Sequence, residues 1–388
     1  MATGSEKTNE DDGKFCLIKG TPIVTKKASY TVQGLVGEGS FGAVYKVTEK
    51  DESRLFAMKC EAKASKSLPK LDVEKDILIQ IGGRKHFTTL IDYGENKAFR
   101  YIIMELLGKN LSDLKKEQPA SVFSMSTGLK ASQQCLMACR ELHSIGYIHR
   151  DVKPANYAIG LNQNRKMIYL LDFGISRRYG IGPGESTRQV VFKGTLPYAS
   201  TSCHRCDELG PRDDCESWFY MLVDLISPMG LPWSMARDAD AVLAMKENVM
   251  RGKVGMFLCG VKCKKILLKI SRYLKKLTCH DKVDYALLLK IVDEAAQRCK
   301  CNLEAPFDWE PDTVIANSPM LKTPSSKSPM KSSSLSREST SSNNDSTLRN
   351  PLASTQSIVV VNHLSYSHGT KASSSSHALV RSMITAAL

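Results

Sequence analysis

The sequence contains no apolar run that approaches the ~20 residues of a membrane span. Residues 1–13 are polar and acidic, without the apolar core of a secretory signal peptide. The twelve cysteines are scattered along the chain and do not form a disulfide framework. We therefore expect an intracellular protein of the cytoplasm or nucleus, without a membrane span and with reduced thiols.

The phosphate-binding motif G-x-x-x-x-G-K-[ST] is also missing, which argues against a P-loop nucleotide-binding regulator. No nucleic-acid-binding motif is visible, and we expect no nucleic-acid partner. Cys203 and Cys206 have a spacing found in zinc sites, but no second close pair joins them. The sequence therefore favours ordinary thiols in a loop over a metal site.

The net charge is strongly positive, +14, and most of it lies between residues 30 and 311. A basic globular body suits an acidic or phosphorylated substrate, an anionic polymer or a membrane surface. Composition divides the 388 residues into three parts. We expect a polar N-terminal extension at 1–29, a globular domain at 30–310 and a disordered Ser-rich tail at 311–388.

Two kinds of periodicity follow each other within the globular domain. The strand-like segments, expected to form one five-stranded sheet, are 30–36, 43–47, 55–59, 87–93 and 99–105. The segments with helical periodicity are 67–81, 122–145, 214–223, 239–250, 262–274 and 283–296. A small sheet with one helix is therefore followed by a larger, mainly helical part.

The glycines Gly37, Gly39 and Gly42 form a G-x-G-x-x-G pattern after the first strand. Residues 43–47 continue as a strand and not as a helix, so the glycines join two strands in a hairpin. Such a hairpin can lay backbone N–H groups over phosphates, or it can be purely structural.

Lys59 ends the third strand, shortly after this hairpin. A lysine there can lie at the sheet edge or reach the phosphates of a nucleotide. Glu74, on the predicted helix, is the candidate partner that would orient it. Glu61 and Asp72 are rivals for this pairing.

The stretch 149–156 reads HRDVKPAN, and Asp172-Phe173-Gly174 follows after an apolar run. Phosphoryl transfer needs a carboxylate for the acceptor hydroxyl, a lysine for the transferring group, and oxygen ligands for magnesium. Asp151, Lys153, Asn156 and Asp172 supply these groups within two short loops. We expect Asn156 and Asp172 to be the metal ligands.

Five motifs follow one another here in the order and spacing that protein kinases have: the glycine hairpin, the strand lysine, the helix glutamate, HRDVKPAN and DFG. On these motifs, residues 30–298 resemble a eukaryotic protein kinase. The lysine at position 153, within HRDVKPAN, resembles the residue that serine/threonine kinases have at this place in the motif. Four further segments resemble the casein kinase 1 superfamily and, within it, the tau-tubulin kinase branch. They are MKCE at 58–61, MELLGKNL at 104–111, NYAIG at 156–160 and DFGISRRY at 172–179.

The resemblance implies an α+β, bilobal protein kinase fold. Its N-lobe would span about 30–105 with five strands and one helix, and its C-lobe about 109–310. The cofactors it implies are ATP and Mg²⁺. The residues it places around ATP are Val36, Gly37, Glu38, Gly39, Ser40, Phe41, Gly42, Ala43, Val44, Ala57, Lys59, Glu74, Glu105 and Leu107. Met104 would lie behind the adenine or simply fill the core.

The implied activity is transfer of the ATP γ-phosphoryl group to Ser or Thr hydroxyls of protein substrates. Kinases of this type generally need no activation-loop phosphorylation, so we expect constitutive activity. We also expect a monomer. Thr195 would brace the catalytic loop against Asp151. The alternative is a pseudokinase scaffold, but pseudokinases usually lose Lys59, Asp151 or Asp172 equivalents, and this chain has all three.

Pro197 departs from the family pattern, which usually has a basic residue there that helps to hold an anion. Without that basic residue, we do not expect the chain to depend on substrates that are already phosphorylated. Arg177, Arg178, Arg188 and Lys193 remain nearby, so we expect acidic protein substrates. The resemblance to the tau-tubulin kinase branch implies cytoskeletal proteins as a further possible class.

Overall fold

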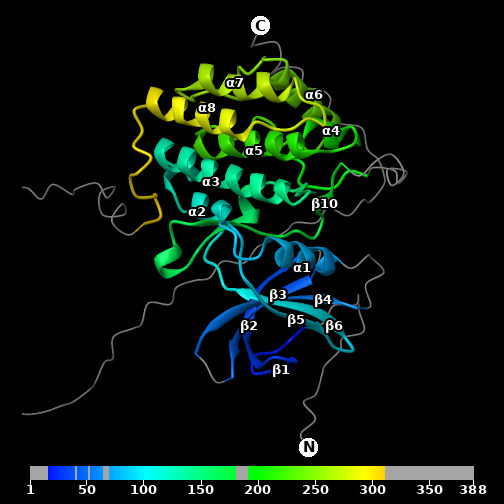
Figure 1. Ribbon diagram of the computed structural model, residues 1–388. Coiled ribbons are helices and arrows are strands. Elements are labelled where there is room, and N and C mark those ends of the chain that lie inside the picture. Colours follow the sequence, from blue (N-terminus) through cyan, green and yellow to red (C-terminus); the bar gives the residue numbers. More distant parts are fainter. Residues whose placement is uncertain (1–15, 40–41, 51–52, 64–69, 181–190, 311–388) are drawn as a thin grey trace, which may run out of the picture.

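The computed structural model of the chain describes residues 16–39, 42–50, 53–63, 70–180 and 191–310. The predicted tail at 311–388 therefore lies outside the described residues, as do Ser40, Phe41 and Arg188. Figure 1 shows two parts, a curled sheet with helix α1 beside it and a stack of helices. This is the α+β, bilobal arrangement that the sequence predicts.

The first part is an antiparallel sheet with the strand order β1-β2-β3-β4-β6-β5. Short strand pairs in the helical part carry the catalytic loops, with β7 beside β10 and β8 beside β9. The strands are β1 (Pro22–Val24), β2 (Ser29–Gly39), β3 (Gly42–Glu49), β4 (Leu55–Ala62), β5 (Leu90–Glu95), β6 (Phe99–Glu105), β7 (Tyr147–Ile148), β8 (Tyr157–Ile159), β9 (Ile168–Leu170) and β10 (Arg177–Arg178).

The sheet has six strands, where the sequence predicts five. The additional strand β1 lies within the expected N-terminal extension and pairs with β2, with Ile23 opposite Tyr30. Ile23 is buried, whereas Pro22 and Val24 are exposed. A single inward-facing residue is too short a pattern to indicate a strand by alternation, which explains why the prediction misses it.

The α-helices of the described residues are α1 (Lys70–Ile81), α2 (Leu111–Lys116), α3 (Met125–Ser144), α4 (Thr201–His204), α5 (Pro211–Ile226), α6 (Ala239–Met250), α7 (Lys264–Leu274) and α8 (Tyr285–Arg298). The helix predicted at 239–250 has these bounds. The one predicted at 214–223 is longer at both ends, because Pro211 is well placed in a first helical turn and Asp213 caps the N-terminus. None of these helices has the length and apolar content that crossing a bilayer requires.

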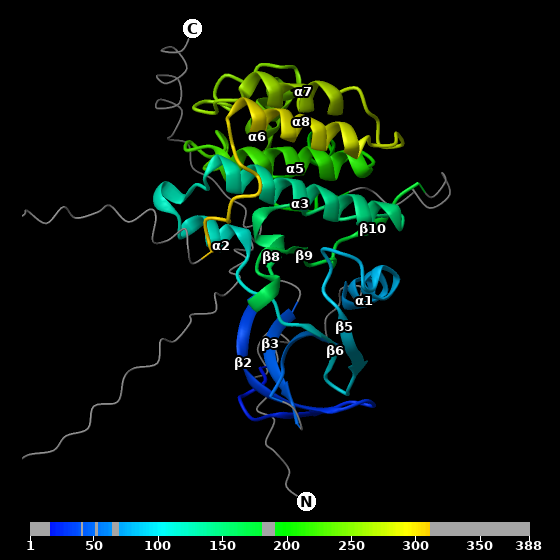
Figure 2. The ribbon, with the colours of Figure 1, turned by 60° about the vertical axis from the view of Figure 1, so that its left-hand side comes forward.

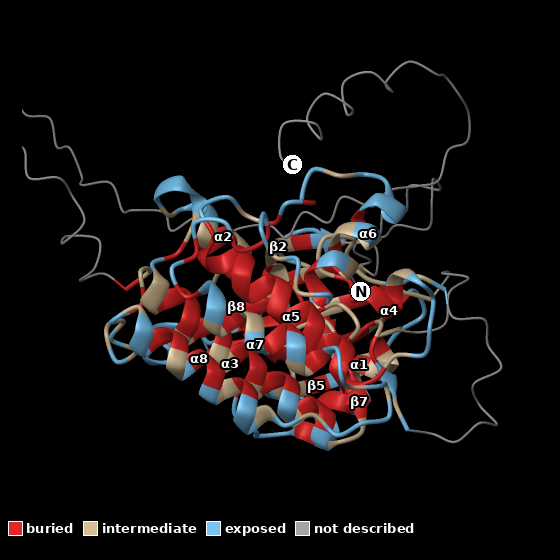
Figure 3. Ribbon diagram, turned by 90° about the horizontal axis from the view of Figure 1, so that it is seen from above, coloured by how far each residue is buried: buried red, intermediate tan, exposed pale blue. Residues whose placement is uncertain are grey.

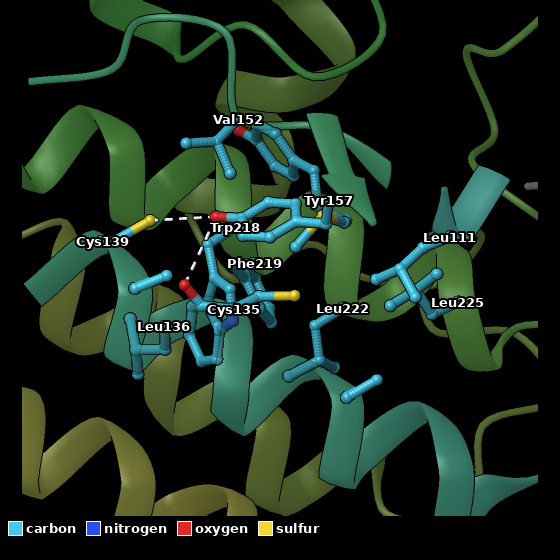
Figure 4. Packing of buried hydrophobic residues seen from close by; sticks show 14 of the residues in the cluster. Leu111, Cys135, Leu136, Cys139, Val152, Tyr157, Trp218, Phe219, Leu222 and Leu225 are labelled. Atoms are coloured by element: carbon cyan, nitrogen blue, oxygen red, sulfur yellow. Dashed lines mark hydrogen bonds between the residues drawn. The ribbon is translucent and has the colours of Figure 1, made fainter. Parts of the chain in front are cut away.

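Helix α5 is the centre of the helical part, and all of its residues are buried (Figure 3). Helices α3 and α7 pack against it, with α8 beside α3 (Figures 1 and 2). Trp218 and Phe219 of α5 lie beside Cys135 and Leu136 of α3 (Figure 4). The Trp218 indole donates a hydrogen bond of 2.8 Å to the Ser132 carbonyl. Burying each large side chain contributes about 1.5–3 kcal/mol, so α5 is a rigid base for the loops beside it.

The catalytic loops are joined to this core through Tyr157, which follows the HRDVKPAN stretch. Its side chain is fully buried, and its hydroxyl donates to the Cys135 carbonyl at 3.3 Å and lies 3.1 Å from Cys139 Sγ (Figure 4). Val152 is also buried in this cluster. The backbone that carries Asp151, Lys153 and Asn156 is therefore held between buried residues on both sides.

Candidate active site

The glycine hairpin forms as predicted, with Gly39 opposite Gly42 at the end of the β2–β3 pair. Gly42 has φ +132°, and a Cβ added to it would lie 1.9 Å from the Cys60 carbonyl oxygen of β4. Only glycine therefore allows β3 to approach β4 this closely. Gly37 and Ala43 are buried and Glu38 is exposed.

The residues expected around adenine lie in neighbouring strands and in the segment that leaves the sheet. Ala57 of β4 stands opposite Met104 of β6, and both are buried in the core shared with the helices. The other predicted residues are half-buried, as a surface that can receive a ring would be. They are Val36, Val44, Glu105 and Leu107.

Lys59 forms the predicted pair with Glu74 of α1, at 2.5 Å, and also contacts Asp172 at 2.9 Å. The rival Glu61 is engaged elsewhere, because it accepts hydrogen bonds from the Lys70 and Leu71 N–H groups at the start of α1. A carboxylate at a helix N-terminus is stabilised by the helix dipole and by unpaired N–H groups. Glu61 therefore fixes the position of α1, and Glu74 fixes Lys59.

The second rival, Asp72, forms a surface pair with Lys75 at 3.3 Å. Lys59, by contrast, joins the sheet, α1 and the DFG loop in one network. Burial alone would lower the pKa of Lys59, but Asp172 and Glu74 outweigh it and raise that pKa. Burial would raise the pKa of Asp172, but Lys59 outweighs it and holds that pKa well below its usual range. The lysine is protonated and the aspartate ionised at neutral pH.

Asp151 is held by three neighbours in the helical part. Thr195 Oγ1 donates to its carboxylate at 2.6 Å, and Lys153 Nζ lies 2.7 Å from the other oxygen. Asn156 Nδ2 donates to the Asp151 carbonyl at 2.8 Å and to its carboxylate at 3.2 Å. Lys153 also donates to Thr195 at 2.8 Å. The predicted contact between Thr195 and Asp151 is thus present.

The donor set suits magnesium. Because Asn156 uses Nδ2 toward Asp151, its amide oxygen is directed elsewhere, and no described residue donates a hydrogen bond to it. The ionised Asp172 provides a second hard oxygen, the ligand type that Mg²⁺ prefers. The Asn156 carbonyl and the Leu171 N–H are hydrogen-bonded at 2.9 Å, which brings the two loops together.

Sequence reasoning missed the residue that holds the catalytic loop. Asp214 of α5 is buried and accepts hydrogen bonds from the His149 N–H at 2.6 Å and the Arg150 N–H at 2.9 Å. Its carboxylate also meets His143 Nε2 at 2.8 Å. Arg150 has φ +71°, a strained conformation for a residue with a side chain, and these bonds stabilise it. The available signal was a carboxylate on a helix whose apolar pattern indicates burial.

The DFG phenylalanine also has a structural role. The Phe173 ring is buried between Phe87 and His149, with ring centroids 6.0 and 5.6 Å apart. His149 Nε2 lies 2.9 Å from the Leu171 carbonyl, so the histidine joins the catalytic loop to the DFG loop. These contacts place Asp172 beside Lys59.

Among the described residues, Cys203 and Cys206 do not gather with other metal-ligating side chains. Cys203 is buried with Sγ 3.3 Å from the Lys193 carbonyl, and Cys206 is exposed. Within the described ranges, the one cluster with metal-ligand spacing is Glu208, Cys279 and His280. It includes neither cysteine of the pair.

Comparison with known proteins agrees with this geometry. A model of the protein kinase domain matches residues 30–265. The chain belongs to the protein kinase family.

Individual relatives narrow this assignment. The kinase is 33% identical over 270 residues to a "Putative serine/threonine-protein kinase" of Caenorhabditis elegans, covering 66% of this chain and 79% of the relative. It is 32% identical over 275 residues to a "Probable casein kinase I homolog" of Encephalitozoon cuniculi, covering 68% and 84%. It is 34% identical over 224 residues to a "Putative casein kinase I" of C. elegans, covering 56% and 65%. The protein is thus a casein kinase 1-like serine/threonine kinase.

Such a kinase carries out ATP-dependent phosphoryl transfer to protein substrates. The pseudokinase alternative finds no support, because Lys59, Asp151 and Asp172 are all present and each contacts an active-site partner.

Proposed function

We propose that this kinase is a constitutively active, Mg²⁺-dependent enzyme that works as a monomer inside the cell. We assign it to the tau-tubulin kinase branch, on the residue segments that resemble that branch, and we propose acidic or cytoskeletal proteins as its substrates. The observation that carries constitutive activity is the bridge from Lys59 to both Glu74 and Asp172. It holds α1, the sheet and the DFG loop together through the side chains of three unmodified residues.

In the proposed mechanism each residue has one task. Lys59, oriented by Glu74, neutralises charge on the α- and β-phosphates of ATP. Asn156 and Asp172 would hold magnesium, which when bound offsets charge on the β- and γ-phosphates. Positioning and charge neutralisation supply most of the rate gain, since the transition state is loose.

Asp151 orients the substrate hydroxyl and takes its proton late in the transfer. Its carboxylate is already set by Thr195, so the acceptor meets a base of fixed direction. Lys153, beside both residues, stabilises the transferring phosphoryl group. The hairpin at Gly37, Gly39 and Gly42 would cover the phosphates with backbone N–H groups.

The proposed substrate preference rests on exposed positive charge near the site. Arg177, Arg178 and Lys193 are exposed. Lys193 is close enough to Lys70 of α1 to contribute, after burial, to a lowered pKa of that lysine. An acidic side chain of the substrate would relieve this repulsion. Pro197 offers no cation, so a phosphorylated residue is not required.

Arrayed peptides test this proposal. Peptides with acidic residues before the acceptor serine should be phosphorylated faster than neutral ones, and phosphorylated peptides no faster than acidic ones. Phosphatase treatment of the kinase should leave its rate unchanged, and removing divalent cations with EDTA should abolish it. Equal rates for acidic and neutral peptides would refute the acidic preference, and activity lost on dephosphorylation would refute constitutive activity.

A further inference from the structure

Helix α6 carries a lysine in an unusual position. Lys246 is fully buried, although lysine is almost never fully buried without a charged partner. Among the described residues no carboxylate lies within ion-pair distance of its Nζ. The carboxylate with the largest effect on it, Glu216, is paired with Arg212 at 2.7 Å. A buried ammonium group without a carboxylate costs free energy, and its neighbours must therefore explain its presence.

Those neighbours belong to the chain segment that follows Thr195. Lys246 Nζ donates to the Leu196 carbonyl at 2.8 Å and to the Ala199 carbonyl at 2.7 Å, and lies 3.0 Å from His204 Nε2. The rings of Tyr220 and Trp233 lie 5.1 and 5.6 Å from Nζ. Such rings stabilise a buried cation.

The carbonyl bonds do not depend on the charge state of the lysine. Burial, which outweighs Glu216, lowers the pKa of Lys246 to about 7. An ammonium group has three N–H donors and the neutral amine retains two. Two donors suffice for the Leu196 and Ala199 carbonyls in either state.

A second donor approaches the same segment. The Trp233 indole N–H donates to the Pro197 carbonyl at 2.7 Å. Three of the four carbonyls from Leu196 to Ala199 therefore accept hydrogen bonds from Lys246 or Trp233. The remaining residue, Tyr198, is held through its hydroxyl, which donates to Asp224 at 3.0 Å.

This segment begins at Thr195, which contacts Asp151 and Lys153. A polypeptide whose hydroxyl reaches Asp151 must pass beside the residues next to Thr195, and Leu196 and Pro197 are half-exposed there. We propose that Lys246 is a positioning residue for the protein substrate: it holds the Thr195–Ala199 segment from beneath, in the shape against which the substrate lies. This inference rests on the proposed function, because it assumes that the substrate hydroxyl is delivered to Asp151.

The test compares three variants of the full chain, with casein as the phosphate acceptor. Lys246→Met keeps a long side chain but removes the donor to the Leu196 and Ala199 carbonyls. We expect it to raise the KM for casein about tenfold and to leave the KM for ATP within about twofold. Trp233→Phe, which removes only the donor to Pro197, should shift the KM for casein in the same direction.

Val242→Ala is the matched control, because Val242 is fully buried on the same helix and its side chain has no polar atom. It should lower the melting temperature without changing the ratio of the two KM values. Two results would refute the positioning role. One is that Lys246→Met changes the KM for casein and the KM for ATP in parallel. The other is that Lys246→Met and Val242→Ala, at an equal loss of melting temperature, have the same KM for casein.

Hydrogen exchange provides a readout that needs no catalysis. The Tyr198 and Ala199 amides donate to the Thr195 carbonyl at 2.9 and 3.0 Å. Lys246→Met and Trp233→Phe should each speed exchange of these two amides about tenfold, and Val242→Ala should not. Unchanged exchange in both variants would refute the inference even if the wild type transferred no phosphate to casein. Absent transfer with faster exchange would refute the proposed function and with it the role toward substrate, whereas the support of the Thr195–Ala199 segment by Lys246 would stand.

Discussion

The hydroxyl of Thr195 donates a hydrogen bond of 2.6 Å to the carboxylate of Asp151, although the two residues are far apart in the chain. Lys153 donates to the same hydroxyl at 2.8 Å. Thr195 thus fixes the direction of the proposed base and the place of the lysine beside it. The segment that we propose to meet the substrate and the loop that we propose to perform the transfer are joined at this side chain.

Thr195→Val should therefore lower kcat by roughly 100-fold, since a small displacement of reacting groups has an effect of this size. Valine has the same shape as threonine but cannot bridge Asp151 and Lys153. Thr195→Ser retains the hydroxyl and should stay within a few-fold of the wild type. Steady-state kinetics with saturating ATP would decide, and equal kcat values for the valine and serine variants would contradict the bridging role.

Replacing Glu74 by Gln should lower kcat/KM for ATP about tenfold, because it weakens one charge-assisted hydrogen bond to Lys59. Asp72→Asn is the matched control, since Asp72 lies on the same helix but pairs with Lys75 at the surface. The kinetics of the control should equal those of the wild type. Similar losses in both variants would show that the helix, and not the Glu74 pair, matters.

Asp214 should make the stability of the kinase fall at acid pH. Burial would raise its pKa, but hydrogen bonds and the charges of His143 and His149 outweigh burial and lower it. A carboxylate with a lowered folded pKa stabilises the fold at pH values above its unfolded pKa of about 3.9. This contribution is lost as the pH falls through the lower folded pKa.

Asp214→Asn should consequently reduce the free energy of unfolding at pH 7 by about 3 kcal/mol, because a buried, hydrogen-bonded charge is removed. It should also flatten the decrease in stability below pH 4. Urea unfolding at several pH values would measure both effects. A variant that loses stability at pH 7 but retains the full acid dependence would show that Asp214 is not the group responsible.

Gly42→Ala should disrupt the glycine hairpin that we propose to cover the phosphates, since the new Cβ would meet the Cys60 carbonyl and the backbone has a positive φ. We expect the KM for ATP to rise about tenfold, as strain of about 1–3 kcal/mol implies. Gly255→Ala is the control, because a Cβ there has nothing within 4 Å. If both variants bind ATP as the wild type does, the hairpin does not need this glycine.

The sequence predicted well which side chains lie together at the candidate site, because each belongs to a short motif with its own spacing. A local motif was enough to identify Asp151, Asn156 and Asp172. Glu74 could be identified because it lies on the predicted helix that follows Lys59. What the sequence did not show depends on contacts between distant segments. The position of Glu61 at the α1 N-terminus is one such contact.

The support of the active site is a second such case. Asp214 and Lys246 lie on helices, and their periodicity indicates burial but not which backbone atoms they reach. Strand β1 was missed for a different reason, since its signal is one buried residue and the rest comes from pairing with β2. Long-range hydrogen bonds of this kind carry no mark in a single sequence.

The central claim is that Asp151 and Asp172 make this chain an active serine/threonine kinase. The most direct test is transfer of radiolabelled phosphate from Mg-ATP to casein by the wild type, Asp151→Asn and Asp172→Ala, followed by phosphoamino-acid analysis. We predict label on serine or threonine with the wild type and at least about 100-fold less with either variant. Equal labelling by the wild type and both variants would contradict the account.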